Sequence, residues 1–228
     1  MSAPSRPRGF RQPRCGGCGL SAALCVCGLW PPLEASIDIS VIMPRSEARS
    51  ASNTARLLAL WLPRTHLNVV GERDGTPTPA HLVERPGSAL LFPDARGPRG
   101  VPAAVTHLIV PDGTWSQARR IERRWFARHE LPRIHLDDTW PSAYELRRAR
   151  AGVCTFEATA LALGLMQNLP VARTLLTRFA EWARRADWLK AGGHPERAAS
   201  TLLDWDRQLA AHPAIRHLDS LAAASSRG

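Results

Sequence analysis

Long apolar runs are missing from this chain of 228 residues. No stretch approaches the roughly 20 consecutive apolar residues that a membrane-spanning helix needs. The first residues also lack the apolar core of a secretory signal peptide. We therefore expect a cytoplasmic protein with no membrane partner. Its length suits one main domain with a small appendage.

Lysine is almost absent, because only Lys190 among the 30 basic residues is a lysine. The formal net charge of +10 predicts a polyanionic partner, and arginine side chains match phosphate geometry and stack on bases. A GC-rich genome would also favour arginine over lysine. Such a bias does not explain the excess of basic over acidic residues, so RNA or DNA is the favoured partner.

Cysteine is scarce, yet four of the five cysteines stand within thirteen positions, at Cys15, Cys18, Cys25 and Cys27. Two close pairs of this kind can supply a tetrahedral thiolate site for zinc or another soft metal, although C-x-C is tighter than the usual C-x-x-C. Disulfides are less expected than metal or free thiols in a cytosolic chain. Four thiolates leave no open position for substrate, so we expect a structural site.

An apolar run at 105–110 is followed at once by Pro111, Asp112 and Gly113 and then by a basic helical pattern. This order predicts a buried strand, a tight turn and a helix, and Thr114 has capping-box spacing to Gln117. Ligands of open α/β sheets bind beyond the carboxyl ends of the strands. Asp112 is therefore expected at the mouth of such a crevice, or else serves only as a turn residue.

Strands alternate with helices along most of the chain, which predicts an α/β fold with a mostly parallel sheet and flanking helices, ending in C-terminal helices. Strands are expected at 37–43, 67–70, 88–92, 105–110 and 133–136. Helices are expected at 50–62, 79–84, from 114 onwards, from 155 with Thr155 as the N-cap, at 171–189 and at 195–211. Trp182, Trp188 and Trp205 are expected to pack between helices rather than to stack on bases.

Three basic segments have two interpretations each. Residues 1–14 form a flexible basic arm that lies along a phosphate backbone or is an inert tail. The loop at 95–102 contacts a backbone or is a plain connection. The helix after Thr114 carries a row of arginines that is either a solvated face or a nucleic-acid patch: Arg119, Arg120, Arg123, Arg124 and Arg128.

Six short motifs, in this order, resemble those of the DTW-domain family, and most closely its bacterial tRNA-uridine aminocarboxypropyltransferases. They are the cysteine cluster at 15–27, Ser52-Asn53-Thr54 with Arg56-Leu57, Leu91-Phe92-Pro93, Asp112-Gly113-Thr114-Trp115 with Ala118-Arg119, Ser142-Ala143-Tyr144 with Leu146-Arg147, and Cys154-Thr155 with Glu157-Ala158. Each motif is weak alone, but six at compatible spacing are specific. The second D-T-W, at 138–140, is treated as a coincidence.

This family is similar to SPOUT enzymes, so the resemblance implies a SPOUT-like C-terminal knot that holds S-adenosylmethionine. Knots are too rare for a sequence pattern alone to predict one. The expected organisation is a basic arm at 1–14, a small cysteine-rich metal knuckle at 15–30 with a structural zinc, a catalytic domain at 31–215 with a helical C-terminus, and a tail at 216–228.

The reaction implied by the resemblance transfers the 3-amino-3-carboxypropyl group of S-adenosylmethionine, a co-substrate, to N3 of a uridine in tRNA, in the variable loop or the D-loop. Asp112 is expected to be the general base, or to hold the donor's positive groups. Arg147 is expected to bind the donor's carboxylate or a phosphate. The residues expected to line the donor and uridine pockets are Ser52, Asn53, Thr54, Phe92, Pro93, Gly113, Thr114, Trp115, Ser142, Tyr144, Arg147 and Thr155.

Two other functions stay open at this point. One is a SPOUT-like RNA methyltransferase that uses the same donor and releases S-adenosylhomocysteine instead of methylthioadenosine. The other is a non-catalytic, zinc-containing module that binds RNA in a salt-dependent way. The sequence gives no sign of an obligate protein partner.

Overall fold

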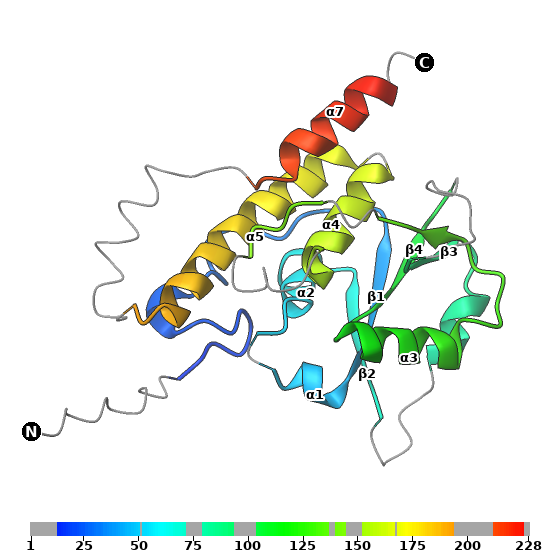
Figure 1. Cartoon of the computed structure of the whole chain (residues 1–228), viewed down its shortest axis with the longest axis horizontal. Coiled ribbons are helices and arrows are strands. Elements are labelled where there is room, and N and C mark those ends of the chain that lie inside the picture. The colour runs from blue at the N-terminus through cyan, green and yellow to red at the C-terminus, as the bar shows by residue number, and fades with distance from the viewer. Residues whose placement is uncertain are drawn as a thin grey trace, which may run out of the picture.

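A five-stranded parallel sheet forms the centre of the molecule in a computed structural model of the chain (Figure 1). The described residues are 13–50, 52–71, 79–93, 104–136, 140–144, 152–166, 168–193 and 212–225. The strands are β1 (Asp38–Pro44), β2 (Thr65–Val70), β3 (Ser88–Leu91), β4 (His107–Pro111) and β5 (Arg133–Ile134). Every neighbouring pair is parallel. The predicted α/β fold with a mostly parallel sheet is confirmed.

Helices cover both faces of this sheet. They are η1 (Ala22–Leu24), α1 (Arg45–Ala48), α2 (Arg56–Trp61), η2 (Pro79–Glu84), α3 (Trp115–Trp125), α4 (Thr155–Leu165), α5 (Leu169–Lys190) and α7 (Ile215–Ser225). Along β1, Ile39 and Val41 belong to the core under α2, α4 and α5, whereas Ile42 packs with Ile109 and with Ile121 of α3. Alternate residues of a strand point to opposite faces, and both faces are covered, which explains why β1 and β4 are buried along almost their whole length.

The strand order β2-β1-β4-β3-β5 creates a point where the chain changes direction across the sheet. From β1 the chain moves to β2 on one side, and from β4 it moves to β5 on the other side. The carboxyl ends of β1 and β4 therefore flank the position where open α/β sheets bind ligands. The backbone N–H of Asp112 donates to the carbonyl of Ile42 at 2.8 Å, so Asp112 lies directly at the end of both strands.

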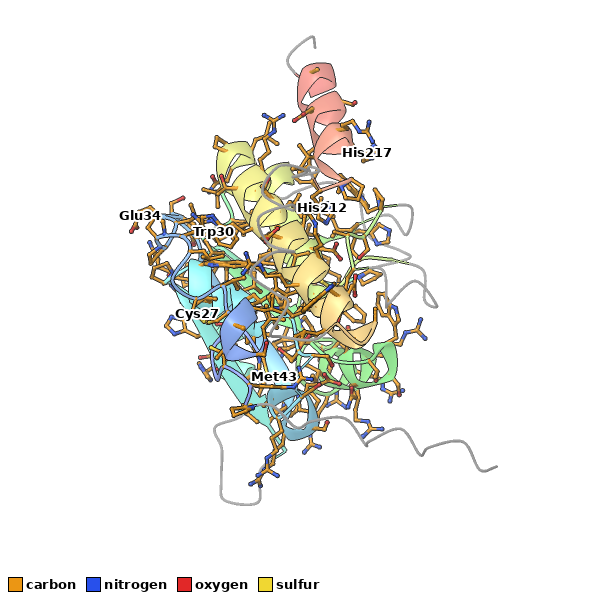
Figure 2. The ribbon with its side chains drawn as sticks, turned by 90° about the vertical axis from the view of Figure 1, so that its left-hand side faces the viewer. Cys27, Trp30, Glu34, Met43, His212 and His217 are labelled. Carbon is orange, nitrogen blue, oxygen red and sulfur yellow. The ribbon has the colours of Figure 1, made fainter. Side chains whose placement is uncertain are left out.

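The cysteine-rich segment packs on α5 (Figure 1). The indole Nε1 of Trp182 donates to the carbonyl of Cys18 at 2.9 Å, and the guanidinium of Arg178 donates to the carbonyl of Pro31 at 2.8 Å. The same guanidinium lies 5.7 Å from the ring centroid of Trp30, which is labelled in Figure 2. Trp182 is buried, as expected from the sequence.

Several local predictions need correction. The helix expected from residue 50 begins only at Arg56, because the residues before it form a loop in which the side-chain Oδ1 of Asn53 accepts the Arg56 N–H at 3.2 Å. Residues 79–84 form a 3-10 helix. The N-cap of α4 is Cys154, so Thr155 is the first helical residue.

Residues 216–225, expected to be part of a tail, belong to α7, which contacts α4 and α5. Leu218 of α7 is buried. A Cβ atom at Gly164 of α4 would lie 2.9 Å from this leucine, so the glycine allows α7 to approach closely.

Some expected features lie outside the described residues. These are the first twelve residues of the basic arm, the loop at 95–102, Asp138 and Thr139, Arg147, the helix at 195–211 with Trp205, and residues 226–228. Among the helices that the structure describes, none is both long and apolar enough to cross a bilayer.

Candidate functional site

Asp112 lies at the carboxyl end of β4 and is held by side chains from two other parts of the chain. Its Oδ2 accepts a hydrogen bond of 2.6 Å from Asn53 Nδ2, and its Oδ1 accepts one of 2.5 Å from Thr155 Oγ1. The aspartate is only 4% exposed. A buried carboxylate must be hydrogen-bonded, and these two donors fix the orientation of its plane. Asp112 therefore does more than complete a turn.

The loop that carries Asn53 is tied to the neighbouring backbone. Arg56 donates from Nη2 to the carbonyl of Ser50 at 2.8 Å and to the carbonyl of Ala48 at 3.3 Å. Asn53 itself is 5% exposed, with its amide nitrogen on Asp112 and its carbonyl oxygen on the Arg56 N–H. Because both ends of the amide have partners, its orientation is defined.

The turn after Asp112 leads into α3 with the capping box that the sequence predicts. The N–H of Thr114 donates to Gln117 Oε1 at 2.7 Å, and the N–H of Gln117 donates to Thr114 Oγ1 at 3.3 Å. Gly113 has a φ of 133°, and a Cβ atom there would lie 2.8 Å from Gln117 Oε1. Only glycine fits between the carboxylate and the cap.

A pocket of about 220 Å³ opens beside Asp112. Its described lining carries two carboxylates, one ammonium group, one side-chain amide and several hydroxyl groups. The lining residues are Glu47, Ser50, Ser52, Asn53, Thr54, Asp112, Gly113, Thr114, Tyr144 and Lys190. Seven of these, namely Ser52, Asn53, Thr54, Asp112, Gly113, Thr114 and Tyr144, are residues that the sequence analysis assigns to the site.

Arg147 lies outside the described residues, and the other described residues of the expected set are not part of the pocket lining. Thr155 supports Asp112. Ser142 donates to Glu157 Oε2 at 2.7 Å. Phe92, followed by Pro93 at the end of β3, makes an edge contact with Trp115 at a centroid distance of 6.4 Å, and Trp115 is 48% exposed.

Glu157 organises the wall of the pocket, a role that sequence reasoning missed although the residue belongs to one of the six motifs. Its Oε1 accepts from the Ala143 N–H and from His212 Nε2, both at 2.7 Å. Its Oε2 accepts from Ser142 Oγ at 2.7 Å and from the Cys154 N–H at 2.9 Å. Burial raises the pKa of Glu157, but His212 and the other donors outweigh burial and hold this pKa below its usual range.

Glu157 thus joins the start of α4 to the segment beside Tyr144 and to His212. The imidazole of His212 lies just before α7 (Figure 2). Neither side chain of the Glu157–His212 pair is exposed to solvent. No short motif marks His212, because its partner is 55 residues away in sequence.

Glu47, Ser50 and Lys190 are the lining residues that sequence reasoning missed. Lys190 ends α5, and its ammonium group donates to the hydroxyl of Tyr144 and lies 4.4 Å from the centroid of that ring. The one available signal was compositional, since Lys190 is the only lysine in the chain.

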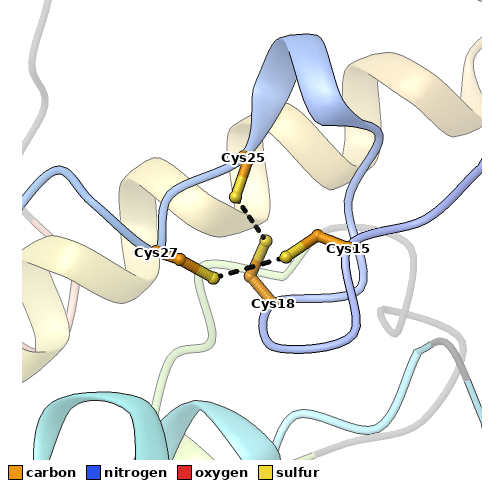
Figure 3. A group of neighbouring side chains, drawn as sticks. All are labelled: Cys15, Cys18, Cys25 and Cys27. Carbon is orange, nitrogen blue, oxygen red and sulfur yellow. Dashed lines mark hydrogen bonds between the residues drawn. The ribbon is translucent and has the colours of Figure 1, made fainter.

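The four N-terminal cysteines meet in one cluster, as predicted (Figure 3). All four sulfur atoms lie within 4.8 Å of one another, with 3.4 Å between Cys15 and Cys27 and 3.7 Å between Cys18 and Cys25. These separations are too long for disulfides. A tetrahedral Zn²⁺ site with Zn–S bonds of about 2.3 Å places its sulfurs about 3.8 Å apart, so the cluster can hold such an ion.

The surroundings of the cluster affect its thiols differently. Hydrogen bonding from the backbone of Cys18 lowers the pKa of Cys15 to about 6. Burial raises the pKa of Cys18 and of Cys27. Backbone N–H groups that stabilise a thiolate are typical of the turns that hold metal-binding cysteines.

The chain is similar in sequence to a known protein family and to several named proteins. A family profile described as DTW domain matches residues 12–186. The chain is 28% identical over 181 residues to tRNA-uridine aminocarboxypropyltransferase 2 of Macaca fascicularis and 29% identical over 185 residues to that of Mus musculus, covering 73% of this chain and 61% of each relative. The Drosophila melanogaster protein of the same name is 28% identical over 188 residues, which is 74% of this chain and 72% of that protein.

The chain thus spans about three fifths of the length of the two mammalian relatives. No solved structure matches it.

Proposed function

Because the chain belongs to the DTW domain family, we propose that it transfers the 3-amino-3-carboxypropyl group of S-adenosylmethionine to N3 of a uridine in tRNA. The observation that carries this proposal is the buried Asp112 carboxylate, fixed by Asn53 and Thr155 beside a polar pocket at the carboxyl ends of β1 and β4. The names of the relatives support the same reaction.

The proposed step forms one bond and breaks another. Uridine N3 is a weakly acidic imide that becomes a good nucleophile when its proton is removed. We propose that Asp112 accepts this proton while N3 attacks the sulfonium-bound methylene carbon of the methionine chain. The carbon–sulfur bond breaks and its electron pair stays on sulfur, so neutral methylthioadenosine leaves. Attack on this carbon rather than on the methyl group depends on how the pocket positions the donor.

The geometry around Asp112 suits this role. Each carboxylate oxygen has more than one lone pair and accepts from only one described side-chain donor, so a lone pair remains that can take the proton. The rival role is electrostatic, with Asp112 holding the donor's sulfonium or ammonium group. Asp112→Asn separates the two, since it keeps the shape of the side chain. Loss of turnover with unchanged donor affinity supports the base, and a matching loss of donor affinity supports the electrostatic role.

We propose that α3 and Trp115 form the surface that receives tRNA. Five arginines of α3 and the residues just after it are exposed, and so is Trp115, which directly follows the lining residue Thr114. The five arginines are Arg119, Arg120, Arg123, Arg124 and Arg128. Contacts with phosphates release counterions, so tRNA affinity should fall steeply as salt rises.

We propose that the cluster of Cys15, Cys18, Cys25 and Cys27 binds a structural zinc ion and that residues 31–215 form the catalytic domain. Four thiolates complete a tetrahedral shell and leave no position for substrate. The SPOUT-like knot is part of this proposal. It is supported by the return of the chain after β5 to the end of β4, where Thr155 contacts Asp112.

The deciding experiment incubates the purified protein with S-adenosylmethionine and unmodified tRNA transcripts, with wild type beside Asp112→Asn, and weighs the nucleosides after digestion. We expect a uridine heavier by one aminocarboxypropyl group, with methylthioadenosine as the by-product, and neither with the variant. A methylated nucleoside with S-adenosylhomocysteine would replace the proposal by a methyltransferase. Salt-dependent tRNA binding without any modification would leave only an RNA-binding module.

A further inference from the structure

Lys190 is the only cation in the described lining of the pocket. It ends α5 and lies beyond the segment that matches the DTW profile, which stops at residue 186. The other charged lining residues are Glu47 and Asp112, both acidic. The pocket therefore presents negative charge from α1 and β4 and positive charge from α5.

The position of the Lys190 ammonium group is defined by Tyr144. It donates one hydrogen bond to the tyrosine hydroxyl and lies over the ring. Tyr144 is 2% exposed and is held by edge contacts with Phe179 and Trp182, two residues of the same helix as Lys190. An ammonium group has three N–H donors, and among the described residues only the Tyr144 hydroxyl accepts one of them, which leaves two for a ligand at the pocket.

The proposed donor carries charges that match this arrangement. Its sulfonium and ammonium groups are cations, which suit Asp112 and Glu47, and its α-carboxylate is an anion that needs a cationic partner. We infer that Lys190 binds the α-carboxylate of the donor's amino acid portion, so that Lys190 is a substrate-binding residue that selects a donor with an intact amino acid group. This inference rests on the proposed function.

The first test compares ligands that differ in the carboxylate. Wild type, Lys190→Gln and the control Arg216→Gln, which removes an exposed cation on α7, are titrated with three compounds. These are S-adenosylmethionine, its decarboxylated analogue, and methylthioadenosine, which lacks the amino acid portion. We expect Lys190→Gln to weaken the binding of S-adenosylmethionine roughly 10- to 100-fold, which is the effect of losing one charge-assisted hydrogen bond. Binding of the other two compounds should be unchanged, and Arg216→Gln should bind all three like wild type.

The second test uses the fact that Lys190 is the only lysine in the chain. Acetylation with an amine-reactive ester, followed by peptide mass spectrometry, reports on this one atom separately from the terminal amine. S-adenosylmethionine should protect Lys190 from acetylation, while methylthioadenosine should not. This measurement needs no turnover.

Three results would overturn the inference. One is an equal loss of affinity for S-adenosylmethionine and its decarboxylated analogue in Lys190→Gln. Another is unchanged donor binding with weaker tRNA binding, which would assign Lys190 to a phosphate. The third is a carboxylate-specific loss in Arg147→Gln but not in Lys190→Gln. If wild type binds the donor and forms no aminocarboxypropyl uridine, the proposed function fails while these binding tests still decide the role of Lys190.

Discussion

His107 should make the stability of this protein depend on pH between about 6.5 and 4. The imidazole lies at the start of β4, the central strand, and is 0% exposed, with Nδ1 2.7 Å from Ser88 Oγ and Nε2 2.9 Å from Ser40 Oγ. Ser88 Oγ donates its proton to the carbonyl of Leu82 at 3.0 Å, so it accepts from His107. The neutral imidazole therefore carries its proton on Nδ1 and accepts from Ser40 at Nε2.

Burial, and next the charge of Arg85, lower the pKa of His107 from 6.5 to about 4. In the unfolded chain the group takes up a proton near pH 6.5, whereas in the folded protein it stays neutral until about pH 4. The unfolded state thus binds more protons than the folded state in this window. The contribution of neutral His107 to the free energy of unfolding is therefore complete above pH 6.5 and is lost as the pH falls toward 4. The linkage relation gives a loss of about 2 kcal/mol between pH 7.5 and pH 5 from this group alone.

The measurement is the free energy of unfolding in urea at several pH values for wild type, His107→Gln, and His129→Gln as the control for an exposed histidine. The pH-dependent loss should shrink by about 2 kcal/mol in His107→Gln and should persist in His129→Gln. Absolute stabilities do not matter here, because only the slope with pH reports the titration. Equal slopes in wild type and His107→Gln would refute the reasoning, as would a charged His107 in nitrogen-15 spectra at pH 6.

Three further predictions concern the site and its supports. Glu157→Gln places an NH₂ group where a carboxylate oxygen accepts hydrogen bonds, which should lower the free energy of unfolding by about 3 kcal/mol. The melting temperature and the affinity for S-adenosylmethionine should fall together. An unchanged melting temperature would contradict the role of Glu157 in joining α4 to the segment beside Tyr144 and to His212. Cys15→Ser should abolish the bound zinc, measured as metal per chain, and destabilise the packing of α5, while Cys154→Ser should keep the metal. Trp115→Ala should weaken tRNA binding by roughly 1–3 kcal/mol, the value of one stacked base, without changing donor affinity, whereas Leu29→Ala, equally exposed, should change neither.

The part of the site that could be predicted consists of contacts between residues close together in the sequence. The apolar run, the Asp112-Gly113 turn and the Thr114–Gln117 capping box lie within thirteen residues, and their hydrogen bonds depend on spacing that the sequence displays directly. The cysteine cluster was predictable for the same reason, since both pairs lie on one short segment.

Other contacts could not be predicted because they join elements that are far apart in the chain. Thr155 has the pattern of an N-cap, and a hydroxyl at a helix start usually caps it. Here the cap is Cys154, and the Thr155 hydroxyl instead reaches Asp112, 43 residues earlier. His212 and Glu157 are likewise 55 residues apart in sequence, and their contact depends on the packing of α7 against α4 and α5.

The two ends of the pocket depend on different parts of the fold, and this separation has a mechanistic consequence. Asp112 is fixed by Asn53 and Thr155, next to the central strands, whereas Lys190 is fixed through Tyr144 by the end of α5. The cysteine cluster packs on that same helix, through the Trp182 hydrogen bond to Cys18. A structural metal at the cluster would therefore influence donor binding through α5 and leave the carboxylate at β4 in place. Removing the metal should raise the donor concentration needed for half-maximal rate more than it lowers the maximal rate.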